Sequence, residues 1–282
     1  MNESETNMET SETETTKRDQ TLNRSTGLMA DSLPEVVEAK ITCRTHGEQK
    51  SQYVKFANGG KTKPSCPLCS EAKHKENEVL RDADDKKRKT EALLGRAGIP
   101  RRFTTKTLDN YSPKNPGSEK VKSVCVRYAD KFMERLAAGG GMVMCGGPGT
   151  GKTHLACAIA NHVIENYQKS CVFMSVLEAT RSVKQTYKRD SEITEQQAIR
   201  VLCSPDLLIL DEVGVQFGSD AEKLILFEII NTRYQDMKPT ILISNLTLVE
   251  LGKYIGERVV DRMREGGGAI LSFDWDSYRG AA

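Results

Sequence analysis

Long apolar runs are missing from this sequence, and so is a clear excess of charge of either sign. Charged residues make up 28% of the 282 residues, and the formal net charge is +2. The apolar runs are far too short to cross a bilayer, and the N-terminus lacks the apolar core of a signal peptide. We therefore expect a soluble cytoplasmic protein without membrane contact. Any nucleic-acid contact must come from local basic patches, because the whole chain is not a polycation.

Most of the eight cysteines do not occur in pairs. A cysteine that lies singly inside an apolar helix or strand pattern is usually a small buried hydrophobe. This use of cysteine suits a reducing compartment. Five residues follow this pattern: Cys125, Cys145, Cys157, Cys171 and Cys203.

The other three cysteines occur with a histidine in two short pairs. Cys43 with His46, and Cys66 with Cys69, each enclose two residues. A strand-like stretch, 51–57, and an Asn-Gly-Gly turn lie between the pairs, which predicts a hairpin there. Two such pairs are typical of a structural zinc ribbon, here with three cysteines and one histidine as ligands. Chance is the alternative, and one pair alone would not decide against it.

Composition divides the chain into four parts. The first is rich in Glu, Thr and Ser and has no periodic apolar face, so we expect a disordered acidic tail. The Cys/His module follows, and after it a run of Lys, Glu, Asp and Arg predicts a solvated helical linker. The predicted bounds are 1–31 for the tail, 32–70 for the zinc-ribbon-like module, 71–97 for the linker and 98–282 for an α/β ATPase domain.

The most specific motif, at residues 146–153, matches the phosphate loop of nucleoside triphosphatases. A short apolar strand, 142–145, precedes it and a helix pattern, 154–163, follows it, which is the context that such a loop requires. Its glycines let the backbone wrap a phosphate, and Lys152 would reach the β- and γ-phosphates while the Thr153 hydroxyl binds Mg²⁺. The predicted nucleotide contacts are Gly146, Gly147, Pro148, Gly149, Thr150, Gly151, Lys152, Thr153 and His154.

A second apolar run, 207–210, ends in two acidic residues. In phosphate-loop enzymes an acid at such a strand end holds Mg²⁺, and its neighbour orients or deprotonates the attacking water. We therefore predict that Asp211 binds the metal and that Glu212 acts on the water. A strand that merely ends in solvated acids is the alternative, and the phosphate loop makes it the weaker one.

Short apolar strands alternate with amphipathic helices over the rest of the chain. This order predicts an α/β fold with a parallel sheet covered by helices on both faces. The predicted strands are 142–145, 171–174, 207–210, 240–244 and 269–273. The predicted helices are 118–136, 153–166, 178–187, 195–202 and 220–236.

Several of these motifs resemble those of AAA+ ATPases. The phosphate loop, the Leu-Leu-Ile-Leu-Asp-Glu strand and the Thr-Ile-Leu-Ile-Ser-Asn strand, 240–245, carry the general resemblance. The stretches 256–264 and 275–279 narrow it to the DnaC-type loaders of the bacterial replicative helicase, within the IstB-like ATP-binding family. The resemblance covers about the last two-thirds of the chain.

The resemblance implies roles for three further residues. Asn245 would be the polar sensor of the γ-phosphate, and Arg262 the arginine finger that reaches the nucleotide of a neighbouring subunit. Arg279 would be the second sensor arginine. From spacing alone, a solvated basic helix face is the favoured explanation of Arg262, and only the resemblance overturns it.

The same resemblance implies an ATPase that loads a replicative helicase onto single-stranded DNA and that self-associates through the finger. The Cys/His module resembles the zinc-bearing front end of DnaI-type loaders, which implies that it grips the helicase. A DNA-binding zinc ribbon, a transposition helper of the IstB type, a phosphotransferase and a non-catalytic adaptor are the alternatives. The acid pair at 211–212 and the Arg262 motif speak against the phosphotransferase.

Overall fold

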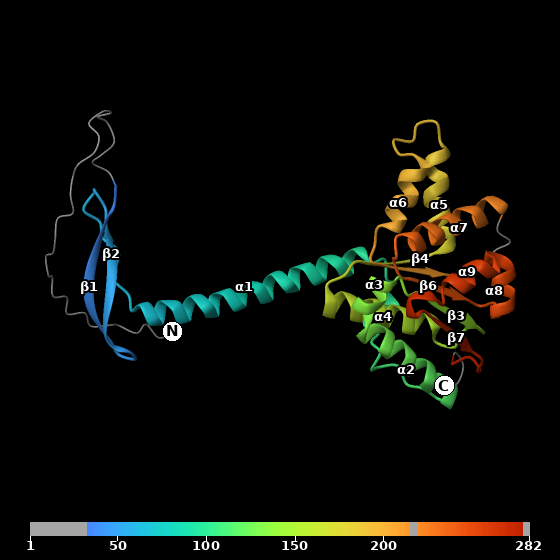
Figure 1. Ribbon diagram of the computed structural model, residues 1–282, viewed down its shortest axis with the longest axis horizontal. Coiled ribbons are helices and arrows are strands. Elements are labelled where there is room, and N and C mark those ends of the chain that lie inside the picture. The colour runs from blue at the N-terminus through green and yellow to red at the C-terminus, as the bar shows by residue number, and fades with distance from the viewer. Residues whose placement is uncertain (1–32, 215–218, 279–282) are drawn as a thin grey trace. The chain divides into compact units, whose positions relative to one another are not determined.

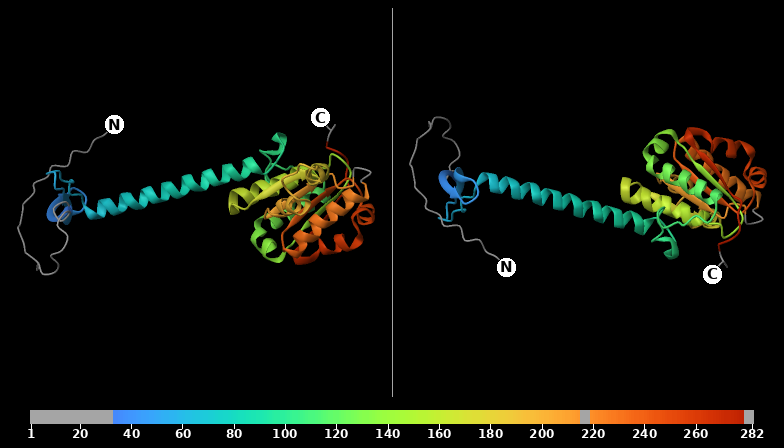
Figure 2. Two further views of the ribbon diagram at one scale, coloured as in Figure 1. Left: turned by 90° about the horizontal axis from the view of Figure 1, so that it is seen from above. Right: turned by 90° about the horizontal axis from the view of Figure 1, so that it is seen from below.

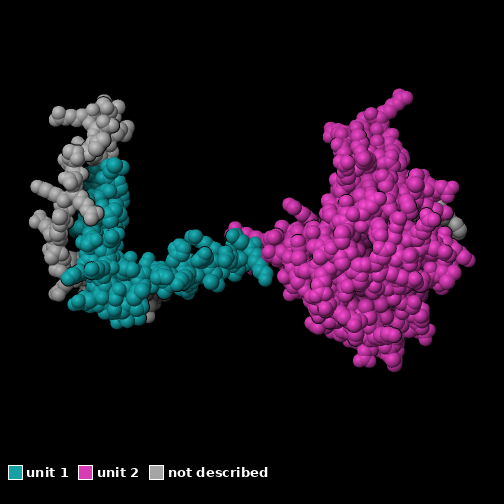
Figure 3. Space-filling model, viewed as in Figure 1, with its two compact units in different colours: residues 1–86 teal, residues 87–282 magenta. Residues whose placement is uncertain are grey.

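The computed structural model describes residues 33–214 and 219–278, so the predicted acidic tail, 1–31, lies outside the described residues. Two compact units, Met1–Lys86 and Lys87–Ala282, make up the chain (Figure 3). Across the described ranges, no helix has both the length and the apolar composition to cross a membrane.

The first unit contains an antiparallel hairpin of two nine-residue strands, β1 (Glu35–Cys43) and β2 (Gly47–Lys55). The prediction of the strand 51–57 is confirmed in part, but its partner was misplaced. β2 pairs with β1, which ends at Cys43. After the turn at 58–60, the chain adds an isolated bridge between Lys55 and Lys61 and a hydrogen bond from the Thr62 N–H to Val54 O at 2.9 Å. Pro64 follows soon after and has no N–H to donate to a ladder.

Helix α1 (Pro67–Arg96) starts inside the second cysteine pair. Proline suits the first turn of a helix, because the N–H that it lacks would have no intrahelical partner there. None of the residues of α1 is buried, as its charged composition predicts. The helix ends before Gly98, which has φ +66° and whose Cβ, if present, would lie 2.6 Å from the carbonyl oxygen of Phe173.

The second unit is built on a five-stranded parallel sheet in the order β4-β5-β6-β3-β7 (Figure 1). All five predicted strands are present. Alternate residues of each strand face opposite sides, so that Met142 and Met144 belong to one core cluster while Val143 and Cys145 belong to the other. The strands are β3 (Met142–Gly146), β4 (Cys171–Ser175), β5 (Leu207–Asp211), β6 (Thr240–Ser244) and β7 (Ala269–Phe273).

Helices cover both faces of this sheet (Figure 2). One face carries α2 (Pro116–Asp130), α3 (Phe132–Ala138) and α4 (Lys152–Tyr167). The other carries α5 (Val176–Lys184), α6 (Glu195–Cys203), α7 (Asp220–Gln235), α8 (Leu248–Ile255) and α9 (Glu257–Arg262). Single 3₁₀ turns lie at Arg101–Phe103, Gln185–Tyr187 and Glu265–Gly267.

The helix predicted over 118–136 is in fact two helices. Lys131, with φ −102° and ψ 24°, separates α2 from α3. The backbone oxygen of Asp130 accepts a hydrogen bond from the Tyr167 hydroxyl, and the Asp130 carboxylate lies 3.4 Å from His162 Nε2. These contacts from α4 fix the break, and a periodic pattern along one segment does not contain them.

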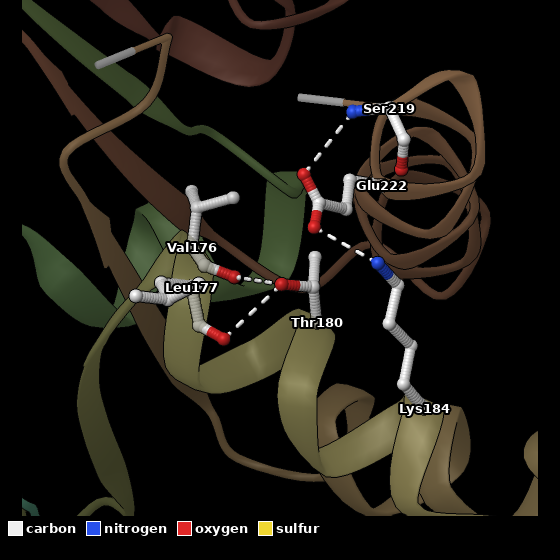
Figure 4. A network of polar contacts seen from close by, with 6 residues as sticks. All are labelled: Val176, Leu177, Thr180, Lys184, Ser219 and Glu222. Atoms are coloured by element: carbon white, nitrogen blue, oxygen red, sulfur yellow. Dashed lines mark hydrogen bonds and ion pairs between the residues drawn. The ribbon is translucent and has the colours of Figure 1, made fainter. Parts of the chain in front are cut away.

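An ion pair joins α5 to the start of α7. Lys184 Nζ lies 2.9 Å from Glu222 Oε1, while Glu222 Oε2 accepts from the Ser219 N–H at 3.2 Å (Figure 4). Thr180, one turn before Lys184, donates its hydroxyl hydrogen bonds to carbonyls of its own helix, those of Val176 and Leu177. The pair therefore ties the helix after β4 to the helix that follows the Asp211–Glu212 strand end.

Candidate functional site

Strand order brings the predicted nucleotide-binding residues to one edge of the sheet. β6 lies between β5 and β3, and all three strands are parallel. The phosphate loop after β3, Asp211 at the end of β5 and Asn245 after β6 therefore meet at the carboxyl edge. In open α/β sheets this edge is where ligands bind.

The loop between β3 and α4 needs glycine at two positions. Gly146 has φ +128°, and a Cβ there would lie 2.4 Å from the carbonyl oxygen of Phe273. Gly151 has φ +102°, and its Cβ would lie 2.8 Å from the ring of Tyr111. Any L side chain would clash and be strained at both places. Gly147, by contrast, has open space where its Cβ would be.

Lys152, the first residue of α4, is 5% exposed. Its ammonium group donates to the carbonyl oxygens of Gly146 and Gly147, both at 2.6 Å, and lies 3.4 Å from Thr150 Oγ1. The positive charge is therefore held inside the curve of the loop. This is the place from which it can meet a bound phosphate.

The two predicted Mg²⁺ ligands are in direct contact. Thr153 Oγ1 donates to Asp211 Oδ2 at 3.0 Å, and the Glu212 N–H donates to Asp211 Oδ1 at 2.7 Å. Burial raises the pKa of Asp211 above its ordinary value, although these hydrogen bonds lower it. A hydroxyl beside a partly buried carboxylate is an oxygen donor pair of the kind that Mg²⁺ takes.

Glu212 and Asn245 are both exposed. Glu212 has φ +63°, a conformation that few residues other than glycine adopt, so that its side chain leaves the strand end in an unusual direction. The segment after it is fastened to β6, because Val213 N–H donates to Ile243 O at 2.9 Å and the Ser244 hydroxyl donates to Val213 O at 2.6 Å. Asn245 follows Ser244, whose register partner is Cys145.

His154 interacts with the segment before α2 through its side chain. Its Nε2 lies 3.1 Å from Asn110 Oδ1, and its ring meets the Tyr111 ring edge-on with centroids 5.3 Å apart. Burial lowers the pKa of His154. The imidazole of His154 therefore contacts Asn110 and Tyr111. The part of this predicted nucleotide contact that can bind a phosphate is its backbone N–H, in the first turn of α4.

Arg262 is not brought to the phosphate loop of its own chain. Its Nη1 donates to Asn231 Oδ1 at 2.5 Å, and its guanidinium lies over the Tyr234 ring, 4.9 Å from the centroid. Both partners are on α7. The predicted second sensor, Arg279, lies outside the described residues.

Sequence reasoning missed the residues that hold the phosphate loop from outside. Tyr111 OH and Trp275 Nε1 both donate to Thr150 O, at 3.5 and 3.2 Å, and Tyr278 N–H donates to Gly149 O at 3.0 Å. Tyr111 lies 39 residues before the carbonyl that it binds (150 − 111), and Tyr278 lies 129 residues after its own (278 − 149). No spacing rule links them to the motif.

A second candidate site lies in the first unit. The four predicted zinc ligands, Cys43, His46, Cys66 and Cys69, have donor atoms within 4.8 Å of one another. Cys43 Sγ lies 3.5 Å from Cys69 Sγ, and His46 Nδ1 lies 3.3 Å from Cys69 Sγ and 3.6 Å from the other two sulfurs. A tetrahedral Zn²⁺ with bonds of about 2.0–2.3 Å has edges of about 3.3–3.8 Å, so the four atoms fit zinc.

The hairpin turn also prepares one thiol for metal binding. Backbone hydrogen bonds from Thr45 and His46 lower the pKa of Cys43 to about 6. The hydrogen bond that Cys69 makes with Cys43 raises the pKa of the Cys69 thiol to about 11. A thiolate is the form that binds zinc, and a metal would replace the proton that these sulfurs share.

Comparison with known proteins places the second unit in a family. The family model for IstB-like ATP binding proteins matches residues 75–279. The replicative helicase loader DnaC of Buchnera aphidicola (from Acyrthosiphon pisum) is 39% identical over 196 residues, which are 70% of this chain and 78% of the relative. DnaC of Escherichia coli K12 is 34% identical over 209 residues, 73% of this chain and 83% of the relative.

Solved structures share the fold. A crystal structure of the DnaC helicase loader aligns with a TM-score of 0.55 at 24% identity and covers 61% of this chain and 99% of that one. The crystal structure of DnaI gives a TM-score of 0.50 at 20% identity, covering 64% and 93%. With these relatives, a five-stranded parallel sheet and an intact phosphate loop, the chain belongs to the IstB-like ATP-binding family and is a homologue of the DnaC replicative helicase loaders.

Proposed function

We propose that this protein hydrolyses ATP and loads a replicative ring helicase onto single-stranded DNA. The observation that carries the proposal is its 39% identity to a DnaC loader over 70% of the chain. The contact of Thr153 with Asp211 supports the chemical part, because it unites two predicted metal ligands that are distant in sequence. Loading would occur during initiation of replication.

The chemistry would follow from the groups at the carboxyl edge of the sheet. Lys152 would bind the β- and γ-phosphates, while Thr153 and Asp211 would hold Mg²⁺, which would supply positive charge to offset that of the phosphates. Glu212 would orient and deprotonate the attacking water, with Asn245 beside the γ-phosphate. Arg262 would supply positive charge to the nucleotide of the adjoining subunit. Arg279 would supply it to the nucleotide bound by its own subunit.

Coupling to the helicase would depend on assembly. An ATP-bound state with Arg262 engaged would hold subunits together, and hydrolysis would release them. Such a cycle requires that assembled and separate states differ in nucleotide affinity, since a ligand shifts only an equilibrium whose two states it distinguishes. The Cys₃His module would hold structural zinc and, with α1, bind the helicase.

The proposal is tested by phosphate release from ATP, with and without single-stranded DNA and with and without the replicative helicase from the same genome. We expect turnover to change when DNA or helicase is added. Glu212→Gln should bind ATP normally and lower turnover about 10²- to 10⁴-fold, the usual range for a general base. Glu178 offers a matched control, because its carboxylate only caps α5 by accepting from the Ser175 N–H at 2.8 Å. Glu178→Gln should leave turnover unchanged. Normal turnover in Glu212→Gln would contradict the role given to Glu212.

A transposition helper is the second candidate, and the family model that matches residues 75–279 favours it, because it describes IstB-like proteins as a group. Such a helper would use the same ATP chemistry to deliver a transposase to target DNA. Turnover that responds to DNA and to a transposase, yet is indifferent to the helicase, would select this candidate over the loader.

A further inference from the structure

Two adjacent carbonyl groups of the phosphate loop are bound by donors from outside the loop. The backbone N–H of Tyr278 donates to Gly149 O at 3.0 Å. The next carbonyl, Thr150 O, accepts from the Trp275 indole N–H at 3.2 Å and from the Tyr111 hydroxyl at 3.5 Å. Three donors from two distant segments therefore hold two consecutive peptide units.

The direction of these carbonyls fixes the direction of two amides. A trans peptide is planar, and its C=O and N–H point to opposite sides of the chain. The peptide that contributes Gly149 O also contributes the Thr150 N–H, and the peptide of Thr150 O contributes the Gly151 N–H. Donors that hold the two oxygens on one side thus direct these two N–H groups to the other side, as a phosphate-binding loop needs.

We propose that Trp275 and Tyr111 are positioning residues that orient the phosphate-binding amide of Gly151. They act through the single oxygen that both of them bind, and neither side chain needs to touch the nucleotide. The inference rests on the proposed nucleotide site and adds to it residues that lie outside every part of the loop motif.

Both side chains are themselves held in place. Tyr111 is 3% exposed, and its ring lies against Gly151 and meets His154 edge-on. Trp275 packs on Phe273, with ring centroids 5.0 Å apart. Phe273 is the register partner of Gly146, so the indole is joined through β7 to the strand from which the loop starts. Rigid support of this kind is what a positioning residue requires.

The test removes each donor while keeping an aromatic ring at its position. Trp275→Phe and Tyr111→Phe are compared with Tyr128→Phe, which removes a buried hydroxyl bonded to a carbonyl away from the loop, Gly140 O at 2.7 Å. ATP dissociation constants are measured by titration calorimetry, and thermal melting is recorded for every variant. We expect affinity to fall about 5-fold for each single loop variant, the usual value of one hydrogen bond. The double variant should lose more than the product of the two, because Thr150 O then keeps neither donor.

The control separates positioning from general stability. Tyr128→Phe should lower the melting temperature and leave ATP affinity unchanged. Native affinity in the double variant would overturn the inference, whereas absence of ATP binding by the unaltered protein would overturn the nucleotide site itself. If the double variant does not fold, the two single variants decide the question, because each removes one donor from Thr150 O. Native ATP affinity in both Trp275→Phe and Tyr111→Phe would then contradict the proposal.

Discussion

The Cys₃His cluster and the phosphate loop are built in opposite ways. Four side chains make the cluster, and in the described part of its unit only Ile41, Ser51 and Cys66 are buried. The phosphate loop is made mostly of backbone, and the sheet beneath it carries two large apolar clusters. For a small unit with so little core, we expect stability to depend on a metal. The phosphate loop rests instead on a core that does not depend on a ligand. We therefore expect loss of zinc to unfold the first unit, and loss of nucleotide contacts to leave the second unit folded.

The largest expected effect is the loss of structure in the Cys₃His unit when its metal is removed. Cys66→Ser, or a strong zinc chelator, should unfold residues 33–66 and take the bound zinc from one per chain to none. Zinc content and protease sensitivity of that segment measure this. ATP affinity of the second unit should stay the same. Cys157→Ala, which alters a buried cysteine outside the cluster, should retain zinc; a zinc-free protein with a protease-resistant hairpin would refute the idea that metal replaces a core.

The nucleotide site should show the reverse behaviour in Lys152→Ala. Loss of a buried ammonium that contacts phosphate costs about 3 kcal/mol, so ATP should bind about 100-fold more weakly. The melting temperature without nucleotide should remain close to that of the unaltered protein, because the core does not depend on this charge. Calorimetry and thermal melting give both values. Lys131→Ala, on the surface, is the control, and ATP affinity within 3-fold of normal in Lys152→Ala would exclude the assigned role.

The interior of the second unit can be tested at Arg233, which is fully buried. Its guanidinium donates to Thr240 Oγ1 and to the carbonyls of Cys203, Pro205 and Pro239 at 2.6–2.9 Å. Burial lowers its pKa to about 10. Arg233→Met removes the guanidinium donor from all four oxygens, although Cys203 O keeps the Lys238 ammonium and Pro239 O keeps the Leu208 N–H. We expect the free energy of unfolding to fall by about 3 kcal/mol.

Urea unfolding measures this loss, with Arg200→Met on the exposed side of α6 as the control. Zinc binding by the first unit should not respond to Arg233→Met. A change in unfolding free energy no larger than that of Arg200→Met would show that the buried hydrogen bonds of Arg233 do not stabilise the core.

The smallest expected effect concerns the ion pair of Lys184 with Glu222. The hydrogen bond and charge of Lys184 lower the pKa of Glu222, so the stabilisation is present above the unfolded-state pKa and is lost as pH falls through the lower folded-state pKa. Glu222→Gln should therefore cost less than about 1 kcal/mol near neutral pH and nothing in acid. Melting temperatures of both proteins across pH 2–7 check this, and a difference that grows in acid would contradict it.

Sequence reasoning succeeded where the signal is local. The strands of the sheet are short apolar runs, and the phosphate loop is a contiguous motif, so both were predicted with the neighbouring helices. The four Cys/His residues were likewise predicted as zinc ligands from their spacing, and their donor atoms do converge.

Long-range contacts explain what was missed. The hairpin partner of β2 was misplaced because a segment on either side of β2 could pair with it. Only Pro64, in the segment that follows β2, disfavours that one as the partner. The break at Lys131 depends on contacts from α4, and the support of the loop by Trp275 and Tyr111 depends on side chains brought together by the fold. Propensity along one segment contains none of this information.

Loading itself is the most direct test of the account. The replicative helicase from the same genome would be mixed with closed circular single-stranded DNA, and the amount that co-elutes with the circle would be measured with ATP and with or without this protein. The account predicts that the helicase ring reaches the closed circle only when the protein and ATP are both present, and that Lys152→Ala fails to support it. Equal amounts of circle-bound helicase with and without the protein would contradict the proposed function.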